Sequence, residues 1–337
     1  MEKYLARGLN SLIVSDKKML DRLDIIIVND GSKDKTSSIG HDFEKKYPGV
    51  IRIIDKPNGH YGSCINSALK VATGLYVKVM DADDTYITTG LEEVLKTIIS
   101  LIDSEQLPDA LITDYRVVDE NGDVTSHVNY LIPKQEMLQT ADHTTQMLHM
   151  QMHAIAYRTD LLKDIKYMQT EGIMYTDSEW VTYPVPYCRT LYYLPSELYS
   201  YVFGREGQSM ERKTMIKNIR MFAMISARMF EESIQKHNLE FVYAFYREKS
   251  KQLISTAIAL IVLYADMREV NKSLQVLDEI LRKYPQQYNE FVENIRIWNR
   301  FSFNPVFEFR KRGRLSRLLI LTLRTYCNGI KLISKFK

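Results

Sequence analysis

The stretch Tyr76-Val77-Lys78-Val79-Met80-Asp81-Ala82-Asp83-Asp84 delivers three carboxylates directly after a short apolar run. In an open parallel α/β sheet, ligands bind beyond the carboxyl ends of the strands. Oxygen-rich positions of this kind suit a divalent cation and the nucleotide that it accompanies. The alternative is a solvated turn before a helix, which the Asp-x-Asp pattern alone does not exclude.

The residues upstream favour the strand-end interpretation. Residues 24–28 are β-branched and apolar throughout, as expected of a strand that is buried on both faces of a parallel sheet. They end in a turn cluster, 29–34, in which Ser32 or Asp34 is expected to cap the next helix. Residues 50–54 predict a second strand.

A second helix and a third strand follow. Apolar positions recur at helical spacing: Ile65, Ala68, Leu69 and Ala72. Gly74 closes this predicted helix, and residues 75–80 predict the third strand. Strand, helix, strand, helix and strand in about 60 residues is a doubly wound α/β layout.

Four motifs in this order resemble those of the family-2 glycosyltransferases with the GT-A fold. They are residues 24–34, Asn58-Gly59 with Gly62 and Asn66, residues 72–76 and residues 80–84. The resemblance is strong over residues 2 to about 90, weaker to about 210 and absent afterwards. It implies an α/β, Rossmann-like GT-A fold with a mixed sheet, followed by a helical extension.

The resemblance also implies roles for single residues. Asp30 would receive the base of a nucleotide-sugar donor, Asp81 would lie near the ribose, and Asp83 would hold Mn²⁺ or Mg²⁺ against the diphosphate. The predicted donor-binding residues are Asp30, Gly31, Ser32, Lys56, Asn58, Asp81 and Arg205. Arg205 belongs to a glycine-rich loop, residues 201–209, that resembles the mobile loop closing over the diphosphate in members of the family. The alternative is that Arg205 is an exposed side chain that contacts only solvent.

The chemistry agrees with these roles. A sugar leaves a nucleotide only if the charge of the departing diphosphate is neutralised, and hard oxygen ligands around Mg²⁺ or Mn²⁺ do this. An aspartate at a strand end can accept the N3–H of uracil, which favours uridine donors. Lys78 is either a phosphate contact or a solvent-facing charge, and we favour the second.

Inverting transfer needs a carboxylate that deprotonates the acceptor hydroxyl. Residues 174–180 resemble the family's acidic acceptor motif, with Thr176 in place of a glutamate. This match implies that Asp177 is the base, with Glu179 as its rival. Alternatively Asp177 caps a helix, and both can hold. His153 could face the acceptor, although a satisfied core histidine is favoured.

Composition suits an enzyme with a second module. The chain has 337 residues, 45% hydrophobic and 26% charged. Cys64, Cys188 and Cys327 form neither a metal motif nor an even disulfide framework, so the cytoplasm is the predicted compartment. The longest apolar stretch, 253–265, is too short to span a bilayer.

The predicted domains are a catalytic domain at 1–210, a helical domain at 211–308 and a basic tail at 309–337. Helices are expected at 211–236, 240–266, 270–284 and 286–299. The tail holds nine basic residues and no acidic one, interleaved with apolar residues. It predicts a cationic amphipathic segment on anionic lipid, at the inner face of the plasma membrane. The apolar content of the tail argues against binding to nucleic acid. The alternative is a helix that packs on the enzyme's own surface.

Members of the family begin with an apolar strand, whereas residues 1–5 resemble the helix start that follows it. We therefore expect the first, central strand to be missing. The prediction is an inverting, metal-dependent bacterial glycosyltransferase that acts on a glycan or lipid-linked acceptor. A catalytically inactive binding module and a nucleotidyltransferase are the alternatives.

Overall fold

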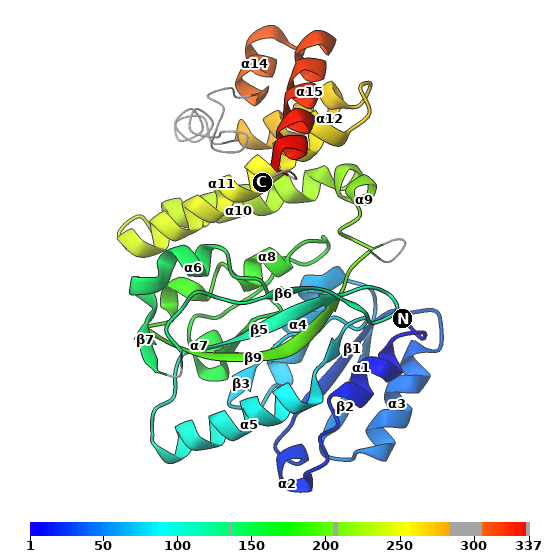
Figure 1. Cartoon of the computed structure of the whole chain (residues 1–337), viewed down its shortest axis with the longest axis vertical. Coiled ribbons are helices and arrows are strands. Elements are labelled where there is room, and N and C mark those ends of the chain that lie inside the picture. The colour runs from blue at the N-terminus through cyan, green and yellow to red at the C-terminus, as the bar shows by residue number, and fades with distance from the viewer. Residues whose placement is uncertain (135, 205–207, 284–304, 335–337) are drawn as a thin grey trace. The chain divides into compact units, whose positions relative to one another are not determined.

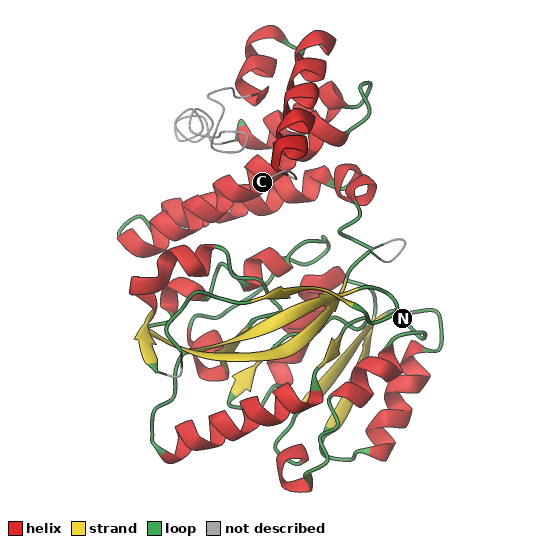
Figure 2. Cartoon of the chain, viewed as in Figure 1, coloured by secondary structure: helices red, strands yellow, loops and turns green. Residues whose placement is uncertain are grey.

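The computed structural model describes residues 1–134, 136–204, 208–283 and 305–334. The chain divides into two compact units, Met1–Arg205 and Glu206–Lys337 (Figure 1). We call the first the α/β unit, because it contains all of the described strands, and the second the helical unit (Figure 2).

The α/β unit contains two sheets. The first pairs β1 (Ile25–Asp30) in parallel with β2 (Ile51–Lys56). The second has the order β3-β8-β5-β9-β4, with β6 beside β5 and β7 beside β9. Its strands are β3 (Tyr76–Val77), β4 (Thr85–Tyr86), β5 (Ala110–Val118), β6 (Val124–Val128), β7 (Met137–Gln139), β8 (Ile155–Arg158) and β9 (Thr190–Val202).

Helices connect and cover these strands. In the α/β unit they are α1 (Leu5–Ser11), α2 (Lys17–Leu20), α3 (Thr36–Lys46), α4 (His60–Val71), α5 (Thr88–Asp103), α6 (Thr144–Leu148), α7 (Thr159–Asp164) and α8 (Asp177–Trp180). Short 3₁₀ helices lie at Thr140–His143 and Val185–Tyr187.

The first half of the predicted layout is confirmed, since β1, β2 and α4 form where expected. The mixed sheet that the resemblance implies is also confirmed: β5 and β9 pair in parallel, whereas β3, β4, β6, β7 and β8 pair antiparallel. The third strand is shorter than predicted, covering only Tyr76–Val77. Among the described strands only β8 pairs with it, so the segment leading to Asp81 has no strand ladder.

One apolar cluster joins the two sheets through α1 and α5. Its buried members are Leu5, Leu9, Leu12, Val14, Ile27, Val50, Ile51, Leu91, Val94, Leu95, Leu194 and Leu198. Each fully buried aliphatic side chain of this size contributes about 1.5–3 kcal/mol of transfer free energy. The cluster thereby fixes α1 against the segment that carries the carboxylates.

The helical unit contains α9 (Arg212–Lys217), α10 (Ile219–Gln235), α11 (Glu240–Tyr264), α12 (Val270–Leu281), α14 (Pro305–Arg312) and α15 (Arg317–Ser334). Arg310 on α14 binds Asp278 on α12, and Arg324 on α15 donates to the carbonyl groups of Val262 and Ala265 at the end of α11. The helix predicted at 286–299 lies outside the described residues. Of the helices that are described, none has the length and apolarity needed to cross a membrane.

Candidate active site

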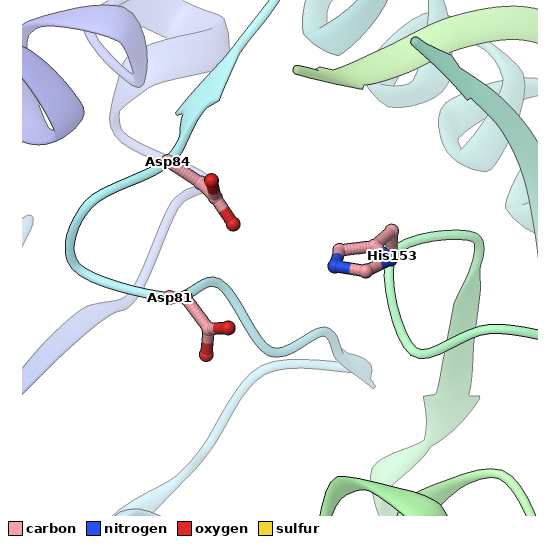
Figure 3. A group of neighbouring side chains, drawn as sticks. All are labelled: Asp81, Asp84 and His153. Atoms are coloured by element: carbon pink, nitrogen blue, oxygen red, sulfur yellow. The ribbon is translucent and has the colours of Figure 1, made fainter. Parts of the chain in front are cut away.

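The carboxylates that follow β3 lie close to a histidine from another part of the chain. Ligand atoms of Asp81, Asp84 and His153 all lie within 4.8 Å of one another (Figure 3). Asp84 is held to β9, because one oxygen accepts from the Tyr199 hydroxyl at 2.6 Å and the other from the Val202 N–H at 2.7 Å. The predicted metal ligand Asp83 is not a member of this group of three.

Helix α1 supports the same segment. The Arg7 guanidinium donates to the Asp83 carbonyl at 3.0 Å, and the Ser11 hydroxyl accepts from the Tyr86 N–H at 2.9 Å. A Cβ at Gly8 would lie 3.1 Å from the Asp84 carbonyl oxygen, so a larger residue would press on the carboxylate segment.

Four carboxylates share this site. Burial raises the pKa of Asp81 well above its usual value, and the charges of Asp84, Asp83 and Asp177 raise it further, while a hydrogen bond from Tyr61 opposes them. Burial also raises the pKa of Tyr201, as do the charges of the same four aspartates. Like charges at close range disfavour ionisation, and a cation would relieve this.

The ring of His153 is buried, and its Nδ1 has no hydrogen-bond partner among the described residues. Its side chain is 8% exposed, and its ring lies 4.8 Å from that of Tyr199 and 4.4 Å from that of Tyr201, between ring centroids. Burial, with a smaller effect of Lys78, lowers its pKa to about 3, so the imidazole is neutral. The predicted core position is therefore confirmed, whereas the hydrogen bond expected of a satisfied ring is not found at Nδ1 within the described part of the chain.

The prediction that Lys78 is a solvent-facing charge is wrong. Its ammonium group donates to the His153 carbonyl at 2.7 Å, and burial lowers its pKa to about 7. Lys78 thus connects the segment between β3 and the carboxylates with the segment that carries His153.

Asp177 is the first residue of α8, and its N-cap is Thr176, which makes no side-chain cap bond. Burial raises the pKa of Asp177, and backbone N–H groups at the helix start partly offset this. Tyr175, two residues before, has φ +66°. A non-glycine residue in this left-handed region is typical of segments that the surrounding structure holds in place.

Glu179 has a different environment from Asp177. It is fully buried, and its two oxygens accept from the backbone N–H and the hydroxyl of Thr170, both at 2.7 Å. These bonds let Glu179 hold the segment before α8. Because Glu179 is fully buried whereas Asp177 is only partly buried, Glu179 is the less accessible of the two to a substrate.

Helix α4 holds the same segment from the other side. The Asn66 amide accepts from the Gln169 N–H and donates to the Gln169 carbonyl, both at 2.9 Å. Gln169 in turn donates through its side chain to the Thr176 carbonyl. A Cβ at Gly62 would lie 2.0 Å from the Thr170 carbonyl oxygen. The motif residues Gly62 and Asn66 thus position the segment that carries Asp177. The role of Gln169 was not predicted, and no sequence pattern around it indicates that role.

The predicted donor residues gather where β1 and β2 end. Asp30 and Lys56 are directly opposite in register, and they form an ion pair at 2.5 Å. The Gly59 N–H also donates to Asp30 at 2.9 Å. Burial raises the pKa of Asp30, but Lys56 and the Gly59 N–H outweigh it and hold that pKa below its usual value.

Gly31 turns the chain sharply after β1. Its φ is +75°, and a Cβ there would lie 2.9 Å from the Asn58 nitrogen. The Ser32 N–H donates to the Asn29 side chain at 3.2 Å. Hence five predicted donor residues, Asp30, Gly31, Ser32, Lys56 and Asn58, come together, whereas Arg205 lies outside the described residues.

Residues 2–165 match the family model described as Glycosyl transferase family 2. The chain carries a glycosyl transferase family 2 domain. This confirms the resemblance that the four sequence motifs indicate, and the matched range includes Asp30, Asp81, Asp83, Asp84 and His153 but ends before Asp177.

Several curated proteins that are similar to this chain are named as glycosyltransferases. An uncharacterized glycosyltransferase of Mycoplasma genitalium is 34% identical over 96 residues, which are 28% of this chain and 32% of that protein. The poly(ribitol-phosphate) beta-N-acetylglucosaminyltransferase TarS of Staphylococcus aureus is 26% identical over 288 residues, 84% of this chain and 42% of TarS. The chain thus spans less than half the length of either relative.

The fold has a solved counterpart. The crystal structure of S. aureus TarS 1–349 in complex with UDP-GlcNAc matches with a TM-score of 0.61 and 19% identity, covering 94% of this chain and 90% of that one. This likeness confirms the GT-A fold with a helical extension that was expected for the family 2 domain.

Proposed function

We propose that the chain is a glycosyltransferase that moves a sugar from a nucleotide-diphosphate donor, a UDP-sugar, to a cell-surface glycan or lipid-linked acceptor with inversion. The observation that supports this best is the grouping of Asp81, Asp84 and His153, whose ligand atoms lie within 4.8 Å of one another, with Asp177 near enough for its charge to raise the pKa of Asp81. The similarity to TarS, whose name specifies N-acetylglucosaminyl transfer to poly(ribitol phosphate), supports a polymer of the cell envelope as acceptor.

In this proposal Asp30 accepts a hydrogen bond from the base, beside Gly31, Ser32 and Asn58. Lys56 orients Asp30 through their ion pair. Asp81 lies near the ribose. Arg205 is proposed to pair with the diphosphate in a fork geometry.

Asp177 takes the proton of the acceptor hydroxyl while that oxygen forms a bond to the anomeric carbon. The bond from the anomeric carbon to the diphosphate oxygen breaks, and its electron pair leaves with the diphosphate. A bound Mn²⁺ or Mg²⁺ supplies charge neutralisation for this leaving group. The residues fit such a cation: Asp83 is its proposed ligand from the sequence, and Asp81, Asp84 and His153 are the ligand-bearing side chains that lie together.

The proposal is tested by melting the chain with a panel of nucleotide sugars and Mn²⁺, followed by transfer assays with the donor that stabilises it best. We expect a uridine donor to raise the melting temperature and NMR to show an inverted anomeric centre in the product. Stabilisation without transfer or hydrolysis would favour the inactive binding module. Release of pyrophosphate when UTP and a sugar 1-phosphate are supplied instead of the nucleotide sugar would favour a nucleotidyltransferase.

Asp83 has its own test. Asp83→Asn should remove the Mn²⁺-dependent part of UDP binding while the melting temperature stays the same. Equal UDP affinity of wild type and variant in calorimetry with Mn²⁺ would contradict its role as a ligand.

We further propose that the chain works at the anionic inner face of the plasma membrane through α15 and the turn before it. The face that packs inward holds Leu315, Ile320 and Leu323, which are buried. Leu318 is 76% and Leu321 52% exposed, and the exposed cations beside them are Lys311, Arg314 and Arg317. Helix α15 can therefore pack against the helical unit through one face and contact lipid through the opposite face.

To test this, Leu318 and Leu321 are replaced by serine, which leaves the docked face intact. The double variant should sediment less with anionic vesicles, and wild-type binding should weaken with salt. Equal sedimentation of both proteins would assign the segment to packing alone.

A further inference from the structure

We infer that His153 is a nitrogen ligand of the divalent cation, together with Asp81 and Asp84, and that the site consequently prefers Mn²⁺ to Mg²⁺. This rests on the metal dependence proposed above and adds the identity of a ligand that no sequence motif marks.

The three side chains come from separate segments. Asp81 and Asp84 lie between β3 and β4, and His153 lies just before β8, yet their ligand atoms fall within 4.8 Å of one another. In Figure 3 a ring nitrogen of His153 points across the gap toward the two carboxylates. The ring is buried and its Nδ1 has no hydrogen-bond partner among the described residues, which is unfavourable for a polar ring. Coordination of a cation at the carboxylates by the nitrogen that faces them would stabilise the ring in this position.

The arrangement is held in place before any ion binds. The Lys78 ammonium holds the His153 backbone, and Tyr199 and Tyr201 pack against its ring. The Tyr199 hydroxyl also donates to Asp84, so one tyrosine orients two of the proposed ligands. Contacts of this kind, to the groups behind the ligands, fix ligand direction in metal sites.

The ligand set decides which ion fits. Mg²⁺ prefers oxygen ligands in near-ideal octahedral geometry and gives up water reluctantly. Imidazole is a softer ligand that favours transition metals, and Mn²⁺ accepts carboxylates as readily as Mg²⁺ does. These two carboxylates and one imidazole, with Asp83 as the further ligand proposed above, therefore favour Mn²⁺ and leave positions for diphosphate oxygens.

The experiment titrates Mn²⁺ alone, and then Mn²⁺ with UDP, into the full chain and records pulsed electron paramagnetic resonance. We expect nitrogen hyperfine coupling from imidazole in the wild type and its loss in His153→Asn. Calorimetry should show that the Mn²⁺-over-Mg²⁺ preference of the variant falls on the order of tenfold or more. His149→Asn is the matched control, since His149 is exposed and lies in the same segment.

A wild-type spectrum without nitrogen coupling, or coupling that persists in His153→Asn, would overturn the inference. So would a failure of the wild type to bind Mn²⁺ both with and without UDP. The proposed function is contradicted by different outcomes. Nitrogen coupling without sugar transfer would support His153 as a ligand and contradict the proposed function. Mn²⁺-dependent transfer without nitrogen coupling would support the proposed function and contradict His153 as a ligand.

Discussion

Two groups of charged residues in the α/β unit differ in how their charge is balanced. Where β1 and β2 end, Asp30 is neutralised by Lys56 and the Gly59 N–H, which hold its pKa low. Between β3 and β4, burial and mutual repulsion raise the pKa of Asp81, and burial raises that of Asp177. We call these the paired site and the carboxylate site.

The difference indicates what each site needs. The paired site is electrostatically complete, so it can present a fixed hydrogen-bonding surface to a neutral base. The carboxylate site is destabilising unless protons or a cation enter, and such clusters of raised pKa are typical of functional sites. Each prediction below changes one side of this contrast.

The largest effect is expected from Asp177→Asn. The amide keeps the shape of the side chain but cannot accept the acceptor's proton, so transfer should fall by a factor on the order of 10² or more. Affinity for UDP and the melting temperature should change little. Initial rates of transfer and calorimetry with UDP measure this.

Glu179→Gln is the matched control on the same helix. It removes a carboxylate that accepts two bonds from Thr170, so stability should fall by about 1–3 kcal/mol in denaturant unfolding. If Glu179→Gln abolished transfer at full stability while Asp177→Asn remained active, the roles of the two residues would be reversed.

The second-largest effect is expected from changing a contact that positions the segment carrying Asp177. Gln169→Glu replaces the N–H that bonds the Thr176 carbonyl by a carboxylate oxygen, which should lower kcat and cost about 1–3 kcal/mol of stability. UDP affinity should be nearly unchanged. Ser67→Ala, on α4 beside Asn66, is the control.

A further readout separates positioning from general damage. Protonation of the introduced carboxyl restores a donor to the Thr176 carbonyl, so the kcat of Gln169→Glu relative to wild type should rise as pH falls. A ratio that stays flat with pH would exclude this hydrogen bond as the cause.

Much of the paired site could be predicted, because its residues are local. Residues 24–34 and 56–59 form one strand end and the next turn, and parallel pairing of β1 with β2 brings them together. Apolar runs and helical spacing were sufficient for β1, β2 and α4.

The carboxylate site could be predicted only in part, because its arrangement depends on contacts between distant residues. Lys78 bonds to a residue 75 positions away, and Asn66 to one 103 positions away. No pattern near Lys78 distinguishes a solvated charge from a buried one, and none near His153 shows that its ring faces two carboxylates. The early end of β3 likewise depends on which strands lie beside it.

The third-largest effect concerns how the stability of the fold depends on pH. Because the pKa values of Asp81 and Asp177 are raised, the folded state binds more protons than the unfolded state. These two residues therefore lower the stability of the fold as the pH rises from about 4, the usual aspartate pKa, through the raised values. The lowered pKa of Asp30 acts oppositely: its stabilisation is lost as pH falls below about 4.

Melting curves in a chelator should therefore show stability declining above about pH 4, and Mn²⁺ should flatten this decline by favouring the ionised carboxylates. Asp81→Asn should flatten it without the metal. A decline of equal slope with and without Mn²⁺ would contradict a cation at the carboxylate site.

The smallest effect is expected from Lys78→Met, which keeps the apolar stem and removes the ammonium. Burial lowers the pKa of Lys78 from 10.5 to about 7, so below pH 7 the folded state carries a buried charge that destabilises it. As pH rises from 7 toward 10.5 this penalty disappears and the bond to the His153 carbonyl remains. Relative to Lys78→Met, the wild type should therefore gain stability across this range and exceed the variant by about 1 kcal/mol at its upper end. Denaturant unfolding of both proteins at several pH values measures the difference. A difference that does not vary with pH would show that Lys78 stays hydrated, and the rigid support that we assign to the His153 backbone would then have to come from the tyrosines alone.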